Sequence, residues 1–371
     1  MLSSARLVRA AMIRYSPKMA RSAVALIIAV VSVSFVACKG GHKPIIQEVP
    51  TVTETAFDAA FEHIREFSLP GVDPSSIIDA TVDSFGNLYI LDSQSLTITR
   101  VTAGRSLAAK AGGAGSGPGK LNRPFRIAVF NNNLIVLDAR PPRVNIYNAA
   151  TGAFEKSFLY HVPRLEGLAG IALAPWPKGG FLIGAFIPDF RKQVDLVYQF
   201  DDEGALIRSF LPRAEVVNTL NLHLHAGVDL RGDQSNQIYA VQPASPIVYR
   251  LHDAGFEEVV SSPPEFYRPP IPYPEKYLAD DPRIQEYNRQ WTRHYAAFPL
   301  DRDRFLDVFF VNGARPFALQ VYTAAGKVLH RNIFTSAKPL STDGNGSVFL
   351  LQGWQSRSDT TLIKIYRVRW R

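Results

Sequence analysis

Three histidines are the residues of this chain most able to bind a metal ion. His223 and His225 are separated by one residue, and His161 comes earlier, in a predicted loop. Side chains two residues apart on a strand face the same side, so we expect the imidazoles of His223 and His225 to point together toward a channel mouth. Such a pair can begin a zinc site, with His161 as the third candidate ligand. Two ligands do not complete a site, so histidines that only form hydrogen bonds are the alternative.

A second candidate site combines aromatic rings with arginine. It lies in residues 261–296, which are rich in proline and aromatic residues. Proline favours an extended, semi-rigid loop over 262–274, and apolar residues at helical spacing predict a helix over 281–295. Aromatic side chains and arginine dominate recognition surfaces. The candidate binding residues are Phe266, Tyr267, Arg268, Tyr273 and Trp291. The alternative is that the apolar side chains only pack on the rest of the domain.

The single cysteine, Cys38, closely follows the longest apolar run, residues 23–36. Five basic residues precede that run, and no acidic residue occurs before Glu48. A basic start, an apolar middle and a small residue at the cut site form a secretory signal. With Cys38 directly after Phe35-Val36-Ala37, the segment resembles a bacterial lipoprotein signal. The resemblance implies cleavage before Cys38 and membrane attachment through a lipid on its thiol. The alternative, an uncleaved anchor helix, needs about 20 apolar residues.

Removal of this signal changes the charge of the chain. The whole sequence has 41 Lys and Arg against 33 Asp and Glu, a net charge of +8, and residues 1–37 hold five of the basic residues and none of the acidic ones. The remaining net charge of +3 gives little support for nucleic-acid binding. Because Cys38 is the only thiol, the domain has no internal disulfide and must depend on packing for its stability.

Beyond a short polar tether over 38–50, a four-strand pattern recurs six times. Each copy has an apolar strand, a polar turn, a second apolar strand and a third alternating strand, and a fourth follows a Gly-containing turn. The equivalent apolar residues of the copies are Leu88, Leu134, Phe181, Ile238, Val308 and Val348, spaced by 46, 47, 57, 70 and 40 residues. Four strands need about 40–50 residues, so the two longer intervals contain insertions.

The sixth copy ends after its third strand, and the alternating segment 61–69 can supply the missing one. Such closure removes exposed sheet edges. We therefore predict an all-β, six-bladed β-propeller over 51–371, with the N-terminal strand closing the last blade. A proline-rich, aromatic and helical insertion, 261–296, lies between blades 4 and 5. An open β-sandwich, the alternative, does not explain six similar units.

The segment from Gly115 to Pro124 leads into a predicted strand and then into a second strand that ends at Asp138. This pattern resembles NHL-repeat propellers over residues 79–158. With the signal, the whole chain resembles exported six-bladed propeller lipoproteins of bacteria. The resemblance implies the fold. NHL propellers include scaffolds, peptide binders, RNA binders and a few enzymes, so the resemblance does not choose a function.

The sequence carries no catalytic signature: it has no Gly-X-Ser-X-Gly elbow, and its sole thiol is the predicted lipid site. We therefore expect a non-catalytic binding or scaffold protein for a peptide, glycan or protein partner. The alternative is a metal-dependent hydrolase or lyase with zinc or calcium in the channel, and no other cofactor is implied. Export and the near-neutral charge disfavour RNA. Lys39 after Cys38 predicts the outer membrane, on its periplasmic or surface face.

Overall fold

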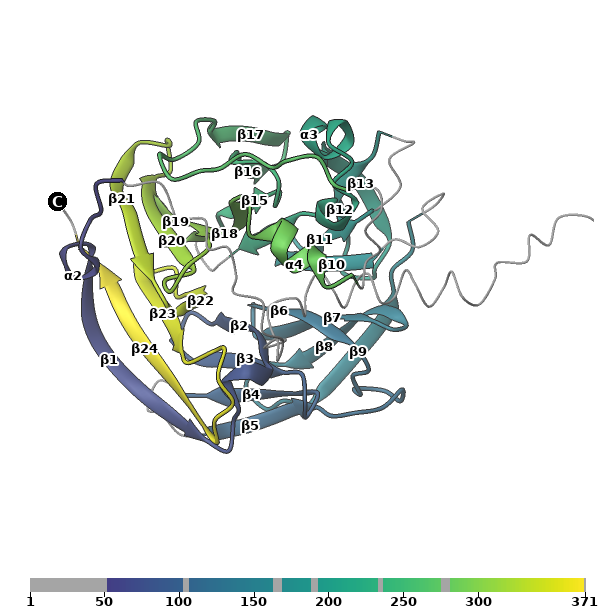
Figure 1. Cartoon of the computed structure of the whole chain (residues 1–371). Coiled ribbons are helices and arrows are strands. Elements are labelled where there is room, and N and C mark those ends of the chain that lie inside the picture. Colours follow the sequence, from purple (N-terminus) through teal and green to yellow (C-terminus); the bar gives the residue numbers. More distant parts are fainter. Residues whose placement is uncertain are drawn as a thin grey trace, which may run out of the picture.

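The computed structural model describes residues 52–102, 107–162, 169–187, 193–232, 236–274 and 281–369. In this part the chain forms six four-stranded antiparallel sheets, arranged as blades around a central axis (Figure 1). The predicted all-β, six-bladed propeller is confirmed. The predicted signal peptide 1–37, the tether 38–50 and the lipidation residue Cys38 lie outside the described residues.

The strands of the first three blades, each from the inner to the outer, are β2 (Ile77–Val82), β3 (Leu88–Asp92), β4 (Thr97–Val101) and β5 (Leu107–Gly112); β6 (Pro124–Phe130), β7 (Asn133–Ala139), β8 (Pro142–Asn148) and β9 (Phe154–Leu159); β10 (Ala169–Pro175), β11 (Phe181–Phe186), β12 (Asp195–Phe200) and β13 (Leu206–Pro212). Those of the next three are β14 (Asp229–Gly232), β15 (Ile238–Val241), β16 (Val248–His252) and β17 (Gly255–Val260); β18 (Arg293–Pro299), β19 (Arg304–Phe310), β20 (Phe317–Thr323) and β21 (Val328–Thr335); β22 (Lys338–Thr342), β23 (Ser347–Gln352), β24 (Thr360–Val368) and β1 (Phe61–Pro70).

The repeat found in the sequence places the second strand of every blade. Its six equivalent residues lie on β3, β7, β11, β15, β19 and β23. The inner strands of neighbouring blades contact one another around the axis. Apolar side chains fill the spaces between blades, as in the cluster that joins blades 5, 6 and 1. Stability therefore depends on packing between sheets, as expected for a chain with a single cysteine.

Closure of the ring follows the prediction. β1 is the outer strand of blade 6 and pairs antiparallel with β24, from Phe61 opposite Val368 to Pro70 opposite Thr360. Figure 1 shows these first and last strands side by side. Phe61 and Leu69 are buried against the core of the last blade.

The insertion differs from its prediction in bounds and in structure. Helix α4 covers only Arg283–Asn288, and β18 begins at Arg293. The insertion therefore ends at residue 292 rather than 296. Residues 293–295 follow the helical spacing, yet they pair with β19 as the inner strand of blade 5. The ladder that completes the blade outweighs local helical preference. Just before α4, Asp281 accepts a hydrogen bond from the backbone N–H of Arg283 at 2.8 Å.

The remaining helices are short and lie in connections. They are α2 (Phe57–Ala60), α3 (Glu215–Thr219) and the 3₁₀ turns η1 (Pro74–Ser76) and η2 (His223–His225). The prediction of a strand at His223 and His225 is wrong, because this segment turns within the linker between blades 3 and 4. None of the helices in the described ranges is long and apolar enough to span a membrane.

Candidate functional site

Charged side chains gather at the axis because of a repeated irregularity of the inner strands. In five blades a β-bulge interrupts the ladder between the inner and second strands. Bulges redirect the side chains beside them. The residues that follow the bulges are Asp79, Arg126, Ala172, Ala296 and Ser341. Charged residues thus occupy this position in blades 1 and 2, and the small residues of the other three leave room for long side chains.

Two ion pairs join blades that are not neighbours in the ring, one between blades 4 and 1 and one between blades 2 and 4. Arg231 Nη1 of β14 lies 2.8 Å from Asp79 Oδ1 of β2, and Arg126 Nη2 of β6 lies 2.9 Å from Asp229 Oδ1. Arg231 Nε also bonds Asp229 Oδ2 at 2.9 Å, and its guanidinium stacks over the ring of Phe298. Because Asp79 and Asp229 are buried, loss of one partner would leave an uncompensated charge in the interior.

Burial and neighbouring charges shift the titration of this cluster. Burial lowers the pKa of Lys338 to about 8, and the charges of Arg126 and Arg231 act in the same direction while Asp79 opposes them. Burial also raises the pKa of Tyr295 to about 12. Burial alone would lower the pKa of Arg231, but Asp229 and Asp79 outweigh it and raise the pKa. Such perturbed groups are typical of functional sites and of structural ion networks alike.

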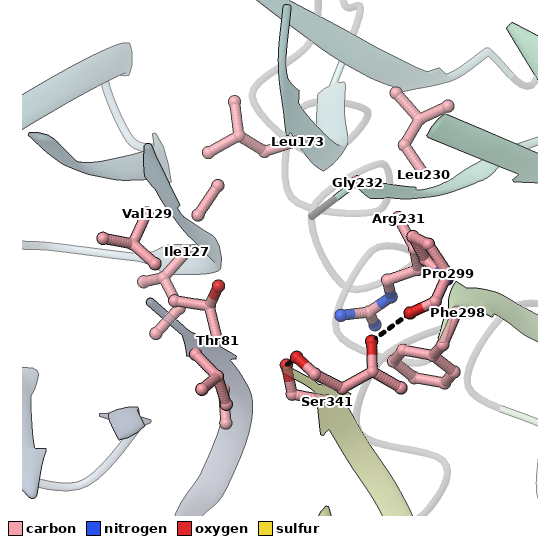
Figure 2. A pocket seen from close by; sticks show the side chains of 14 residues that line it. Thr81, Ile127, Val129, Leu173, Leu230, Arg231, Gly232, Phe298, Pro299 and Ser341 are labelled. Atoms are coloured by element: carbon pink, nitrogen blue, oxygen red, sulfur yellow. Dashed lines mark hydrogen bonds between the residues drawn. The ribbon is translucent and has the colours of Figure 1, made fainter. Parts of the chain in front are cut away.

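A small cavity lies at the axis beside this network, and Arg231 is one of the residues that line it. The cavity has a volume of about 20 Å³ and is lined by all six inner strands. Figure 2 shows the guanidinium of Arg231 pointing toward its centre. A cavity of this size holds about one water molecule. This cavity is therefore too small for a sugar or a peptide.

The insertion and the linker between blades 3 and 4 form a cap at one end of the ring. Both connect an outer strand to the next inner strand, so they lie at the N-terminal ends of the inner strands. Figure 1 shows α4 near the centre of the ring. The cap has its own apolar cluster, whose buried members are Phe186, Val217, Leu222, Leu224, Ala226, Ala244, Tyr273, Ile284, Tyr287 and Trp291. It is therefore an ordered part of the fold.

The structure separates the aromatic candidates by exposure. Phe266 packs on Phe309 and Phe334 of blade 5, while Tyr273 and Trp291 belong to the cap cluster, and all three candidates are buried. Tyr267 and Arg268 are partly exposed. Burial raises the pKa of the Tyr267 hydroxyl, which donates to the carbonyl of Ala244 at 3.3 Å. Packing thus explains three of the five candidates, and only Tyr267 and Arg268 present surface to a partner.

Arg293 is a charged residue at this end that the sequence did not single out. It begins β18, and its side chain is partly exposed. The guanidinium lies 4.5 Å from the centre of the Phe310 ring, and its buried Nε has no hydrogen-bond partner. Burial lowers its pKa to about 10. An arginine with a cation–π contact but no carboxylate can accept an anionic group without breaking an existing ion pair.

The three histidines do not form the predicted pair with a third ligand. His225 is buried, its Nε2 lies 3.0 Å from Asn288 Oδ1, and its ring contacts Trp291. The ring of His223 contacts Tyr273 instead, and His161 is exposed. The described residues contain no group of three or more His, Cys, Asp or Glu side chains that could hold a metal ion.

A larger groove, of about 470 Å³, lies at the opposite end of blades 3 and 4. Its acidic side chains already stabilise turns. Asp201 accepts hydrogen bonds from the backbone N–H groups of Glu203 and Ala205, and Asp202 accepts one from Gly180. Asp253 pairs with Lys178 at 2.5 Å. These contacts give the groove a structural role in joining the two blades.

Sequence reasoning missed the axial residues, although a signal for them exists. Asp79, Arg126, Asp229 and Arg231 are charged residues within or beside apolar stretches, near the start of inner strands. Asp79 and Arg126 occupy equivalent positions of their inner strands, which is the signal for them. The apolar residues of the second strands carry a clearer repeat than the inner strands do.

No protein-family model matches the chain, and no curated protein resembles it significantly in sequence. Its fold resembles a member of the DUF4221 family from Bacteroides vulgatus, with a TM-score of 0.62 and 9% identity over 84% of this chain and 98% of that one. A protein of Bacteroides fragilis described as exported has a TM-score of 0.55 and 12% identity over 85% and 98% of the two chains. Virginiamycin B lyase from Staphylococcus aureus has a TM-score of 0.50 and 10% identity over 82% and 99%. At these identities the chain shares a six-bladed propeller fold with these proteins, and the likeness reaches no further than the fold.

Proposed function

We propose that the protein is a lipid-anchored propeller of the cell envelope that binds a peptide, glycan or protein partner at its cap. The observation that carries the proposal is the cap itself. An insertion and a linker fold around their own apolar cluster at one end of the ring, although the six blades close without them. Long segments of this kind are more often functional than ornamental.

The surface of the cap end supports recognition of a partner. Tyr267 and Arg268 present partly exposed side chains there, and Arg293 carries a positive charge that no carboxylate within the described ranges pairs with. Aromatic and arginine side chains are the types that contribute most to binding energy. We found no set of three metal ligands in the described ranges to support a metal-dependent hydrolase.

Site-specific photocrosslinking tests the binding face. A photoreactive phenylalanine analogue replaces Tyr267 in one variant and Phe85 in another. Phe85 is 81% exposed in the turn after β2, at the opposite end of the ring. We expect one or a few distinct adducts from position 267 in intact cells, none from position 85, and weaker adducts when Arg293 is also changed to Gln. Equal adduct patterns from the two positions would contradict the proposal.

The anchor is tested separately. A variant with Cys38→Ser should lose incorporation of labelled palmitate and leave the membrane fraction, because the thiol is the predicted site of the lipid. The bacterial fold relative described as exported agrees with an envelope location. Retention of label in the serine variant, or a wild-type protein that keeps its first 37 residues, would overturn this part of the proposal.

A further inference from the structure

Two arginines that form no ion pair with an acidic side chain of the described residues lie next to each other at one end of blade 2. Arg123 lies in the linker before β6, and Arg140 lies in the turn between β7 and β8. Their backbones are held together, because the N–H of Ala139 donates to the carbonyl of Arg123 at 3.0 Å. The backbone N–H groups of Arg123 and Arg140 both donate to Asp138 Oδ1, at 2.7 and 3.4 Å. The linker and the turn therefore form one fixed unit.

The only carboxylate of this unit cannot balance the two arginines. Asp138 is fully buried. Its Oδ2 accepts from the backbone N–H of Asn122 at 3.0 Å and from Arg143 Nη2 at 3.1 Å. The negative charge of Asp138 is thus balanced by its ion pair with Arg143. The backbone contacts hold the arginines in place without neutralising them.

The guanidinium groups of Arg123 and Arg140 remain available to solvent. Arg123 is partly exposed and stacks over the ring of Phe125, and Arg140 is exposed. In the described ranges neither guanidinium has a hydrogen bond or an ion pair with an acidic side chain. Burial lowers the pKa of Arg123, and the nearby charge of Arg140 lowers it further. The backbone hydrogen bond between Ala139 and Arg123 places the two arginine residues next to each other.

We propose that Arg123 and Arg140 form a binding site for a phosphate group. Two guanidinium groups can each donate paired N–H bonds to an oxyanion. A phosphate monoester carries a charge of about −1.5 to −2 at pH 7. This charge matches that of two arginines better than the single charge of a carboxylate ligand does. The contact with Phe125 supports the Arg123 side chain, and the shared backbone contacts hold the two arginine residues side by side. The phosphate can belong to a small molecule or to a lipid headgroup.

Titration of the purified protein tests the site. Backbone amide resonances of Arg123, Ala139 and Arg140 are followed by NMR while inorganic phosphate is added at constant ionic strength, with acetate as the singly charged comparison. We expect saturable shifts with phosphate and much weaker ones with acetate. Arg123→Gln and Arg140→Gln should each weaken binding about 10-fold. The control is Arg302→Gln, an exposed arginine in the β18–β19 turn, which should bind like the wild type.

A second measurement distinguishes a lipid headgroup from a soluble ligand as the source of the phosphate. Binding to phosphatidylglycerol vesicles and to phosphatidylcholine vesicles is compared for the wild type and the Arg123→Gln/Arg140→Gln variant. Loss of vesicle binding in the variant assigns a lipid headgroup, and binding of inorganic phosphate without a vesicle effect assigns a soluble ligand. Absence of saturable shifts, or equal weakening by Arg302→Gln, would overturn the site. Crosslinking from position 267 does not depend on this result.

Discussion

At the scale of single residues, we expect the protonation of His225 to make the stability of the cap depend on pH. Burial lowers its pKa to about 3, and the charge of Arg293 adds to the effect, while the hydrogen bond with Asn288 opposes it. An unfolded chain returns the pKa to about 6.5. Between these values the unfolded state binds more protons than the folded state. The contribution of neutral His225 to stability is therefore present above pH 6.5 and is lost as the pH falls toward 3.

The measurement is chemical unfolding of the wild type and of His225→Gln at pH 7 and pH 4.5. A drop of two pH units below the unfolded pKa corresponds to about 2–3 kcal/mol. We expect the wild type to lose about that much more free energy of unfolding than the variant, since glutamine stays neutral. His161→Gln, at an exposed histidine, is the control variant. Parallel losses in wild type and His225→Gln would show that His225 does not carry the acid sensitivity.

The ion pairs between residues at the axis could not be predicted from the sequence, whereas part of the cap could. The helical spacing of Ile284, Tyr287 and Trp291 correctly indicated a shared buried face. Nothing in the spacing of Asp79 and Arg231 could show that they pair, because 152 positions separate them. Contacts across the axis depend on ring closure, which the sequence shows only as a repeat. The expectation that His223 and His225 point the same way is wrong for a local reason, since their segment turns instead of extending and their rings contact different residues.

At the scale of elements, hairpin turns pack directly against the preceding blade. Gly326 lies in the turn before β21 with φ of +79°, and a Cβ atom there would stand 1.9 Å from the carbonyl oxygen of Val259 on β17. Gly204, before β13, likewise meets the ring of Phe158 on β9. Only glycine allows this approach. The Gly-containing turns found in the sequence therefore set the spacing between blades.

Gly326→Ala should destabilise the protein more than Gly71→Ala. Both residues have similar positive φ, +79° and +74°, so alanine strains the backbone to a similar degree at each, but no atom lies within 4 Å of a Cβ built at Gly71. The difference isolates the clash with blade 4, for which we expect about 1–3 kcal/mol. Thermal and urea unfolding of the two variants measure it. Equal destabilisation would mean that backbone strain accounts for the whole effect and that the blades are not in contact through this turn.

The structure of the segments that connect the blades is harder to predict from the sequence than the strands of the blades. The second strand of every blade follows from the apolar repeat, because its side chains are buried on both faces and vary little in type. The helix predicted over 281–295 includes the first three residues of the inner strand of blade 5. These residues form a strand instead of a helix because they pair with β19 and because His294 Nε2 contacts Asp307 Oδ1 at 2.5 Å. Such long-range partners are invisible to local spacing.

At the scale of the whole molecule, β1 carries the closure of the ring. It covers β24, which otherwise forms the edge of blade 6, and it buries Phe61 and Leu69 in the cluster shared by blades 5, 6 and 1. An exposed edge with unpaired N–H and C=O groups is a template for pairing with another chain. A protein that begins at residue 71 should therefore melt at a lower temperature and self-associate.

A second experiment supplies the missing strand β1 as a separate peptide. A synthetic peptide of residues 52–70, added to the protein that begins at residue 71, should return it to a monomer and raise its melting temperature in proportion to peptide occupancy. A scrambled peptide of the same composition should not, because the alternation that places Phe61 and Leu69 inward is lost. A protein that begins at residue 52 is the reference for full stability. Light scattering and thermal unfolding follow both quantities. A truncated protein that stays monomeric and equally stable would show that the ring closes without β1, contrary to the pairing of β1 with β24.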